Sequence, residues 1–537
     1  MKLLKLFSQF LLLLFLLVPP LSAENLPYTI NNGWFPKNQV EYNETRLIVE
    51  GLPSKFLIKL KSGYHIEYAS LFDKNRYIKF SFGERISKGK FLDDTTVDGY
   101  FIANGPEGSY ETKVVIVKPI LDNDGKLKFD EANNVIGDTI SPNDNPIVEV
   151  VSVPKFESKQ QIKEILSSQT TGLSNLSAVD CPIHVKTNDG HVFCISTYSL
   201  IDDDGIKRFK GYLLSISENY GLSNQVVKKL DFEVMNLKAS NTPQLVFDES
   251  LQRLYILLDN QLLTSDDYGQ TFTSVYDIPI DYNDIKIDKD CYIETISSGG
   301  NGIILQNGTI CFPMNILHRY KEIGTDEKGY FHNTREVKYA QCFVLYSTDK
   351  GESWNQSPLT PKDIISWEFS ITEYKKNNIM INARGGTEEN WKRTSFGRRV
   401  FISETTGKGK KWKIKCWAIH PKLDKIMWDP ICNASLITSD IDGKKTAFFS
   451  SPDIPGKYMP RTNLTVKVSV DYKNWAILEH VTGPYEMTQG YSNLDYHNGV
   501  LTIVYCDYLS KRIMFADLTS SVKSFVEHNK RVFTGMT

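Results

Sequence analysis

Short apolar runs separated by polar turns recur along nearly the whole chain. Val, Ile, Leu, Phe and Tyr dominate the runs, and Gly, Asn and Asp separate them. Runs of this length and composition are typical of β-strands, because β-branched and aromatic side chains pack well on a pleated surface. The clearest examples are HVFCIS, RLYILL, GIILQNGTICFPM, AQCFVLYS, NIMINAR, TAFFSS, NLTVKVS and GVLTIVYC. The pattern predicts an all-β fold.

A turn motif repeats between these runs. SDDYGQTF at 265–272 and STDKGESW at 347–354 share the pattern S-x-D-x-G-x-[ST]-[WF], and looser copies end near 221, 412 and 475. An Asp can accept backbone N–H groups across a turn, a Gly can adopt positive φ, and the aromatic residue can pack between strands. We expect Asp267, Asp349 and Asp471 to have this structural role. Unequal repeats with one such turn each are typical of a β-propeller. Five copies, together with strands around 491–517, predict six blades over residues 175–520.

The rest of the chain lacks the turn motif. Residues 24–155 also contain strand-like runs, which predicts an additional N-terminal β-rich domain of unknown role. Residues 156–174 are interpreted as a linker with a short helix, because Ile162, Ile165 and Leu166 fall on one helical face. Residues 521–537 are expected to be a C-terminal tail.

The first 23 residues have the layout of a secretory signal peptide. Two lysines precede an apolar run that ends at Pro19-Pro20 and at small residues, so we expect cleavage before Glu24; an uncleaved membrane anchor is the alternative. This leader predicts a secreted or extracellular glycoprotein with no stable membrane insertion after cleavage. N-x-S/T sequons fit that route, and they lie at Asn43, Asn175, Asn307, Asn355, Asn433 and Asn463.

Composition narrows the possible functions further. The chain has 62 Lys and Arg against 64 Asp and Glu, a net charge of −2 that argues against nucleic-acid partners. There is no CxxC and no HExxH motif, so we expect no metal and no cofactor. Eight cysteines make disulfides possible after secretion, and Cys311 with Cys342 is the pair that we expect on neighbouring strands of one blade.

The turns, known as Asp boxes, and the segments between them resemble the sialidase (neuraminidase) superfamily of six-bladed BNR-repeat propellers. The resemblance covers roughly residues 175–520 and is greatest from Gly299 onward. Four segments carry it in the family's order: SGGNGIILQNGTICFP (298–313), WEFSITEYKKNNIMINARGG (367–386), FFSSPDIPGKYMPRTNLTVKVSVDYKNW (448–475) and GYSNLDYHNGVLTIVY (490–505).

The resemblance implies a set of site residues. Tyr491 corresponds to the family's nucleophile and Glu368 to its general base, with Glu373 a poorer candidate. Arg384 and Arg461 correspond to two of three arginines that bind the sugar carboxylate. The chemistry is consistent, since a carboxylate nucleophile would be repelled by the carboxylate of a sialic acid, whereas a tyrosine would not. Guanidinium groups bind carboxylates with two parallel hydrogen bonds.

The first blade departs from the family pattern. The segment VDCPIHV at 179–185 aligns with the opening strand that carries the third arginine, and it places Asp180 there. The glutamate that normally supports this arginine aligns with Cys506, next to Asp507. An arginine and its supporting carboxylate are therefore replaced together.

The family's general acid aligns with the acidic run LIDDDGIKRF. Asp204 fits the expected spacing best, with Asp202 and Asp203 as near alternatives, and an acidic turn without a catalytic role is an equally good interpretation. Arg208 on the same loop could replace the missing arginine.

These residues support an enzyme and two alternatives. The first hypothesis is a secreted sialidase-like glycoside hydrolase, with intact or impaired activity, that acts with retention on terminal sialic acids of glycoconjugates. The second is a catalytically degenerate propeller that binds glycans or mediates adhesion. The third is a protein-binding propeller that uses its faces without a sugar. The first two predict sialylated or related glycans as partners.

Overall fold

The computed structural model divides the chain into two compact units, Met1–Phe156 and Glu157–Thr537. No helix in the part of the chain that it describes combines the length and apolar character needed to cross a membrane. The signal-peptide prediction lies outside the described residues. The structure describes residues 28–37, 40–52, 56–61, 65–73, 76–81, 100–101, 108–120, 137–138, 147–152, 160, 162–221, 223–237, 242–283, 285–321, 324–325, 331–332, 337–362, 365–386, 398–420, 423, 432–453, 461–483, 488–507 and 512–529.

The first unit contains two antiparallel sheets. One has the strand order β1-β2-β7-β4-β5 with β8 paired to β7, and the other has the order β6-β3-β9. The strands are β1 (Tyr28–Lys37), β2 (Val40–Leu52), β3 (Phe56–Leu60), β4 (His65–Asp73), β5 (Arg76–Ser81), β6 (Tyr100–Phe101), β7 (Gly108–Pro119), β8 (Gly137–Asp138) and β9 (Ile147–Ser152). The additional N-terminal β-rich domain is thereby confirmed.

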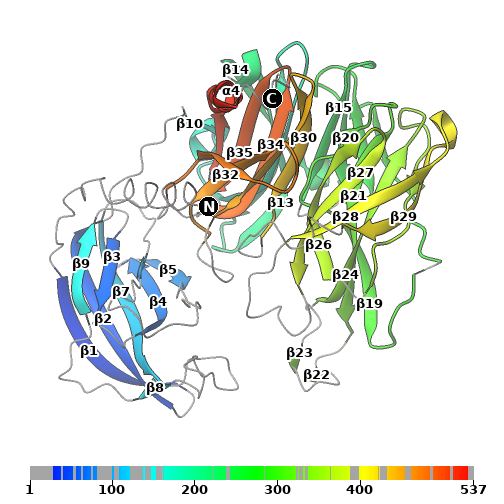
Figure 1. Cartoon of the computed structure of the whole chain (residues 1–537). Coiled ribbons are helices and arrows are strands. Elements are labelled where there is room, and N and C mark those ends of the chain that lie inside the picture. The colour runs from blue at the N-terminus through cyan, green and yellow to red at the C-terminus, as the bar shows by residue number, and fades with distance from the viewer. Residues whose placement is uncertain are drawn as a thin grey trace, which may run out of the picture. The chain divides into compact units, whose positions relative to one another are not determined.

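The second unit contains six antiparallel sheets of propeller type, which are numbered here as blades 1 to 6 (Figure 1). Blades 1 to 3 comprise β11 (Leu176–Lys186), β12 (Val192–Ile201), β13 (Lys207–Glu218) and β14 (Ser223–Asp231); β15 (Gln244–Asp248), β16 (Arg253–Leu258), β17 (Gln261–Ser265) and β18 (Ser274–Asp277); and β19 (Cys291–Ser297), β20 (Ile303–Ile304), β21 (Ile310–Tyr320), β24 (Val337–Ser347) and β25 (Asn355–Gln356). Blades 4 to 6 comprise β26 (Ile365–Lys375), β27 (Asn378–Gly386), β28 (Arg399–Thr406) and β29 (Lys413–Ile419); β30 (Ser435–Ile441), β31 (Lys444–Pro452), β32 (Leu464–Ser469) and β33 (Ala476–His480); and β34 (Thr488–His497), β35 (Val500–Asp507), β36 (Ile513–Asp517) and β10 (Ile162–Leu166).

Helices are few among the residues of this unit that the structure describes. They are α2 (Ser168–Thr171), α3 (Phe232–Met235), α4 (Thr519–His528) and the short 3-10 segments Asn219–Gly221 and Gly409–Lys411. A two-stranded ribbon, β22 (Gly324–Thr325) with β23 (Phe331–His332), stands apart from the blades in pairing.

The innermost strands form a closed ring. Each of β11, β15, β20, β26, β30 and β34 contacts the next, and β34 contacts β11 again. A hollow of about 290 Å³ is lined by residues from all six of these strands, including Lys186, Phe247, Ile304, Thr372, Thr438 and Asp495. The six-bladed propeller is confirmed.

Each pair of neighbouring blades shares one hydrophobic cluster. Blades 1 and 2 meet around Phe193 and Leu245, for example, and blades 6 and 1 meet around Leu166 and Phe515. Removing a large apolar side chain from such a core typically costs about 2–5 kcal/mol. The ring is therefore stabilised by packing between blades as well as by hydrogen bonds within each sheet.

The closing strand of the ring corrects one prediction. Residues Ile162–Leu166 form strand β10, which pairs with β36 and completes blade 6, instead of the predicted helix. The apolar positions have helical spacing, but the register of the strand shifts between Glu164 and Leu166, and Leu166 is fully buried against Ile513 and Phe515. The propeller thus begins at residue 162 and not at 175. The predicted tail is partly helical as well, since Val522 on α4 is buried in the blade 5–6 cluster.

The three Asp-box residues lie in turns between the third and fourth strands of their blades. Asp267 follows β17, and its carboxylate accepts hydrogen bonds from the hydroxyl of Ser265 (2.8 Å) and the N–H of Thr271 (2.8 Å). Asp349 and Asp471 make the same contact with Ser347 (2.8 Å) and Ser469 (3.1 Å). These bonds use the carboxylates to hold the turns.

The structure also bears on the predictions for the cysteines and for the sequons. All eight cysteines are free, and the strand register explains why Cys311 does not bridge to Cys342: Cys311 lies opposite Tyr346, while Cys342 lies opposite Asn315. Among the sequons, Asn433 is buried and donates a hydrogen bond to the carbonyl of Gly299 (2.6 Å), so this side chain is not available for glycosylation in the folded chain.

Candidate active site

The predicted site residues gather at the end of the ring opposite the Asp boxes. In blade 1 the turn after β11 and the turn after β13 lie at one end, because successive strands are antiparallel. The start of β11 and the turn after β12 lie at the other end. Asp180, Glu368 and Tyr491 all occupy the first half of an inner strand, β11, β26 and β34 respectively. The topology therefore separates the turns that stabilise the blades from the candidate chemistry.

Tyr491, Glu368 and Arg384 form one hydrogen-bonded chain. The Tyr491 hydroxyl donates to Glu368 Oε1 at 2.6 Å, and Arg384 Nη1 donates to Glu368 Oε2 at 2.5 Å. The Arg384 guanidinium carbon also lies 4.9 Å from the centre of the Trp367 ring, within cation–π range. The Glu368 side chain is 16% exposed and that of Arg384 is 8% exposed, so the ion pair borders solvent on one side only.

The electrostatics fit a base next to a neutral phenol. Burial opposes ionisation of Glu368, but the charge of Arg384 and the Tyr491 hydroxyl outweigh it, so the pKa of Glu368 lies below its ordinary value. Burial, with the Glu368 charge adding to it, raises the pKa of Tyr491 well above its ordinary value. At neutral pH Glu368 is therefore ionised, and it accepts a hydrogen bond from the protonated hydroxyl of Tyr491. A general base requires this arrangement.

The backbone at Glu368 is unusual. Its φ is +40°, in the left-handed region, and the register between β26 and β27 shifts at this residue. Such a conformation costs about 1–2 kcal/mol for a residue other than Gly. A bulge of this kind re-aims a side chain, as it does at many functional sites.

Arg461 completes this side of the site. Its guanidinium carbon lies 5.8 Å from the centre of the Tyr491 ring, and Nη1 donates to the carbonyl of Gln489. Gly490, with φ of +85°, lies beneath this side chain; an added Cβ there would lie 2.5 Å from Arg461 Cδ. Only glycine therefore allows Arg461 to pass so close to the strand that bears Tyr491.

Asp180 lies beside these residues and faces Cys506. Burial raises the pKa of Asp180 above its ordinary value, and this rise is opposed by the N–H of Cys181, which donates to Asp180 Oδ1 at 2.8 Å, by the charge of Arg461 and by a hydrogen bond with the Cys506 thiol. Cys506 is itself fully buried, and its thiol donates to the carbonyl of Val179 at 3.0 Å. Asp180 and Cys506, which the sequence alignment matched to the family's third arginine and its supporting glutamate, are thus in contact.

The environment of Asp204 differs from the one that a general acid needs. It is on the exposed turn after β12, where its carboxylate accepts the N–H of Ile206 (3.1 Å) and pairs with Arg208 (2.8 Å). These bonds hold the pKa of Asp204 below its ordinary value, whereas a general acid needs a raised one. Arg208 also pairs with Asp202 at 2.6 Å, so in this conformation its guanidinium stabilises the turn. The turn lies at the site end of blade 1, and the catalytic role of Asp204 stays a prediction.

Two residues at the site were not singled out from the sequence. Cys181 interacts electrostatically with Glu368 and Tyr491, and burial raises its pKa well above the ordinary value. Its only sequence signal is its place directly after Asp180. Arg398 is fully buried next to Glu368. In the sequence it lies in the run FGRRVF, where nothing distinguishes it as a functional residue.

One group of side chains in the described part of the chain has the spacing of a metal site. It consists of Asp288, Asp290 and Cys291 on blade 3. Lys338 lies 2.9 Å from Asp290, and Lys362 lies 2.7 Å from Asp288, so lysines already neutralise the carboxylates. This group lies outside the candidate active site, and its contacts are those of a surface ion-pair network.

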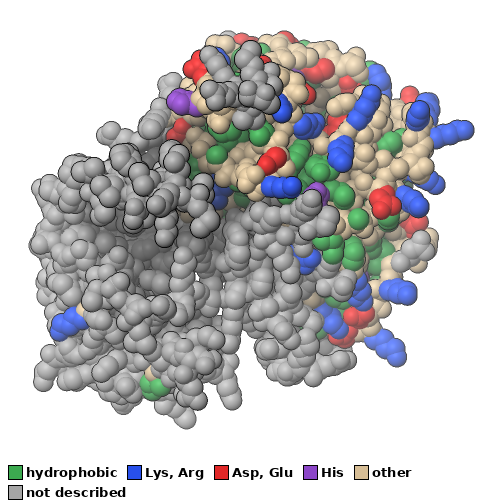
Figure 2. Space-filling view, viewed as in Figure 1, with side chains coloured by type: hydrophobic (Ala, Val, Ile, Leu, Met, Phe, Trp, Pro, Cys, Tyr) green, Lys and Arg blue, Asp and Glu red, His purple; other side chains and the backbone are tan. Residues whose placement is uncertain are grey.

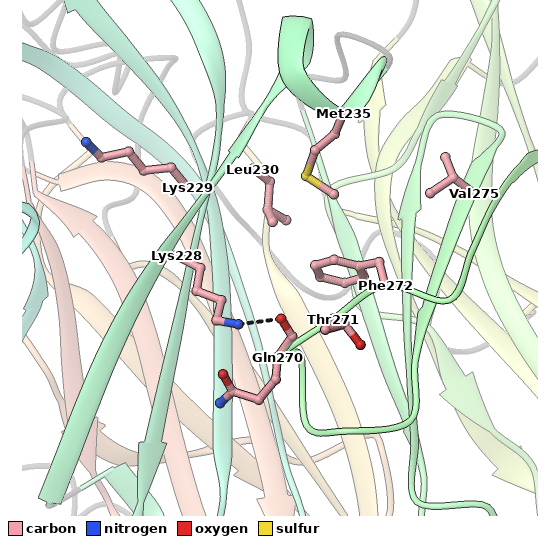
Figure 3. Close-up of a pocket in the computed structure, with 8 residues that line it drawn as sticks. All are labelled: Lys228, Lys229, Leu230, Met235, Gln270, Thr271, Phe272 and Val275. Atoms are coloured by element: carbon pink, nitrogen blue, oxygen red, sulfur yellow. Dashed lines mark hydrogen bonds between the residues drawn. The ribbon is translucent and has the colours of Figure 1, made fainter.

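A larger hollow on the side of the propeller is separate from the site. It measures about 560 Å³ and lies between β14 of blade 1 and the Asp-box turn of blade 2 (Figure 3). Leu230, Met235 and Phe272 line it, and Lys228 Nζ donates to the carbonyl of Gln270 at 2.6 Å. None of the predicted site residues reaches it.

The visible face of the second unit carries charges of both signs. Lys and Arg side chains stand out singly, with acidic and apolar side chains among them (Figure 2). This mixture is that of an ordinary solvated surface.

Comparisons with known proteins were made with this geometry in hand. A model of the BNR repeat-like domain matches residues 218–471. A sialidase of Paraclostridium sordellii is 27% identical over 301 residues, which is 55% of this chain and 65% of that protein. A sialidase of Clostridium perfringens is 26% identical over 271 residues, 48% of this chain and 62% of that protein. The chain thus matches slightly less than two thirds of each relative's length.

Solved structures of sialidases are similar as well. The Hadza microbial sialidase Hz136 has a TM-score of 0.48 at 16% identity, with 92% of this chain and 96% of that chain covered. Trypanosoma rangeli sialidase has a TM-score of 0.46 at 16% identity, with 66% of this chain and 57% of that chain covered.

Proposed function

Because the chain is a BNR-repeat propeller of the sialidase superfamily, we propose that it is a retaining glycoside hydrolase that acts on terminal sialic acids of glycoconjugates. The single observation that supports this most is the hydrogen-bonded chain from Tyr491 through Glu368 to Arg384. A phenol in direct contact with a carboxylate is the pairing that activates a tyrosine as a nucleophile.

The reaction follows from the residue types. The carboxylate of the sugar binds between Arg384 and Arg461. The Tyr491 oxygen attacks the anomeric carbon while its proton passes to Glu368, and the bond from that carbon to the leaving oxygen breaks. The leaving oxygen takes a proton from an acid, for which Asp204 is the candidate. In the second displacement water attacks the same carbon and gives its proton to the acid that was deprotonated in the first step. The bond from that carbon to Tyr491 breaks, Tyr491 regains its proton from Glu368, and two displacements give overall retention.

Asp180 makes this an impaired enzyme. The third arginine would have completed the clamp, and a carboxylate in its place repels the carboxylate of the substrate. Losing one charge-assisted bidentate contact in a partly buried site costs about 2–5 kcal/mol. We therefore expect weak binding and slow turnover of sialosides.

The test is hydrolysis of a fluorogenic aryl sialoside by the purified full chain. We expect slow release that Tyr491→Phe abolishes, and an anomeric product with retained configuration by NMR. Labelling with 3-fluorosialosyl fluoride followed by peptide mass spectrometry is expected to place the sugar on Tyr491. Tyr292→Phe, which alters a half-exposed tyrosine on blade 3, is the matched control and is expected to behave as the parent. Labelling of another residue, or turnover that survives Tyr491→Phe, would contradict the mechanism.

The proposed role of Asp204 as the general acid is tested separately. Asp204→Asn is expected to slow a natural sialoside much more than an aryl sialoside, because a phenolate leaves without protonation. Equal effects on both substrates would leave Asp204 with its observed role in the turn.

A glycan-binding module is the second candidate function. It is favoured by the replaced pair Asp180 and Cys506, because a site that no longer turns over its sugar can still hold it. Binding of sialyllactose without release of sialic acid, unchanged by Tyr491→Phe, would support this alternative.

We also propose that the chain is secreted, on the strength of its leader. Export of the expressed chain with Glu24 as the new N-terminus, read by N-terminal sequencing, is the expected result.

A further inference from the structure

We propose that Arg398 and Asn315 are positioning residues that hold the Glu368 backbone from both sides, so that its carboxylate meets the Tyr491 hydroxyl and the Arg384 guanidinium together. This inference rests on the proposed function and assigns roles to residues that the mechanism above does not use.

Both polar groups of the Glu368 backbone are held by side chains. Its N–H donates to Asn315 Oδ1 at 3.2 Å, and its carbonyl accepts from Arg398 Nη2 at 3.4 Å. The next residue is held as well, since the N–H of Phe369 donates to Ser298 Oγ at 2.6 Å. These contacts come from blade 3 and from the start of β28, so the bulge at Glu368 is fixed from outside its own strand.

Arg398 links Glu368 to the strand that carries Arg384. Its Nε donates to Asn382 Oδ1 at 2.9 Å, and its Nη2 donates to the carbonyl of Asn382 at 2.8 Å. Asn382 lies two positions before Arg384 on β27. The third contact of Arg398 runs from Nη1 to the carbonyl of Cys432 at 2.8 Å, ahead of blade 5. One guanidinium therefore sets the spacing between Glu368 and Arg384.

The cost of burying Arg398 supports a purpose beyond packing. Its side chain is fully buried, and it donates hydrogen bonds to three backbone carbonyls and to the amide oxygen of Asn382. A buried cation is expensive unless its hydrogen bonds are well met, and an apolar residue would ordinarily fill such a position more cheaply. The planar fork of an arginine reaches several acceptors at fixed angles, which a lysine cannot reproduce.

The experiment compares Arg398→Lys, Arg398→Gln and Asn315→Ala in the full chain. Two quantities are measured: kcat and KM for the aryl sialoside across pH, and the titration of the Glu368 carboxyl carbon by carbon-13 NMR, assigned with Glu368→Gln. The groups that act on Glu368 are Arg384, Tyr491, Arg461 and Cys181. Arg253→Gln, on an exposed pair with Asp266, is the control for loss of one arginine, and thermal unfolding monitors folding.

We expect kcat to fall about 10- to 100-fold in all three variants, with KM within a few-fold of the parent, because misplacement affects the reacting groups more than the bound sugar. The Glu368 titration and the acidic limb of the rate profile are expected to move to higher pH, since Arg384 would no longer oppose the effect of burial. Arg253→Gln should match the parent.

The outcomes are separable. If the parent shows no turnover, the proposed function fails, but the NMR titration still decides the positioning role. A parent-like titration in Arg398→Lys would show that charge alone matters and would overturn the proposal for Arg398. If the Arg398 variants do not fold, Asn315→Ala decides, and an unmoved Glu368 titration there overturns the proposal.

Discussion

The two halves of the candidate site differ in how completely they have kept their partners. On blades 4 and 6, Glu368 is held by Arg384 and accepts the Tyr491 hydroxyl, so each charged or polar group has a complementary neighbour. On blade 1 the corresponding position carries Asp180 against the thiol of Cys506, with the positive charges of Lys207 and Arg461 acting on it. The bond-forming pair and the carboxylate clamp can therefore be altered independently, and each half is expected to fail in its own way.

The largest effect is expected in the bond-forming half. Glu368→Gln removes the base that accepts the Tyr491 proton, and kcat for an aryl sialoside should fall about 10²- to 10⁴-fold. Glu373→Gln is the matched control on the same strand, since that carboxylate accepts the N–H of Asn377 and Gln306 instead. Comparable losses in both variants would show that strand β26, and not the pair with Tyr491, explains the effect.

The next effect is a gain, in the blade 1 half. Asp180→Arg with Cys506→Glu restores a supported third arginine, and kcat/KM for sialosides is expected to rise by tens- to thousands-fold, equivalent to about 2–5 kcal/mol. Asp180→Arg alone should gain less, because the inserted guanidinium lacks an orienting carboxylate. Asp180→Ala separates relief of repulsion from gain of a contact. Rapid turnover by the parent that is indifferent to residue 180 would mean that the clamp is completed elsewhere.

These two halves also show what the sequence could and could not predict. The six blades followed from the turn motif, because an Asp box is local chemistry that does not depend on distant residues. Strand β10 was missed because the apolar residues of IKEIL have helical spacing, and only a register shift between Glu164 and Leu166 lets them form a strand. The partner of this strand, β36, lies at the other end of the chain. The same limit applies to Cys311 and Cys342, whose neighbouring strands were predicted but whose register was not.

The candidate site was reached by resemblance and not from periodicity. Nothing local joins Glu368 to Tyr491, which are 123 positions apart, until the ring closes. Arg398 was overlooked for a related reason: three of the hydrogen bonds described above go to backbone carbonyls, which every residue has, so the sequence does not single out its partners. The placement of Asp204 could not be predicted either, because its pairing with Arg208 depends on the conformation of one turn.

A smaller effect tests how Arg461 is seated between the two halves. Gly490→Ala places a Cβ against Arg461 Cδ at a positive φ, and we expect about 1–3 kcal/mol of lost stability and weaker binding of a sialic acid analogue. Gly499→Ala has nearly the same φ, +81°, but no atom within 4 Å of the new Cβ. It should lose stability from strain alone and keep the parent's affinity. Equal affinities for the two variants would show that Arg461 does not contribute to binding.

The smallest expected effect is on stability against pH, and it sets the buried carboxylate of blade 1 against the exposed one. Burial raises the folded pKa of Asp180 above 3.8, its ordinary value. The stability that this group contributes is therefore fully present at low pH and is lost as pH rises through the folded pKa. Asp180→Asn does not titrate, so the parent should lose stability relative to this variant as pH rises from about 4 through the folded pKa of Asp180. Each tenfold change in the acid dissociation constant is worth about 1.4 kcal/mol, so a difference of a few degrees in Tm is expected at most.

Asp204, whose folded pKa is lowered by the N–H of Ile206 and by Arg208, should show the opposite sign, with stability lost as pH falls. Calorimetric Tm values for the parent, Asp180→Asn and Asp204→Asn, taken both below and above about pH 4, measure both slopes. Parallel curves for the parent and Asp180→Asn would mean that Asp180 is as well solvated as a surface carboxylate, which would contradict a pKa raised by burial.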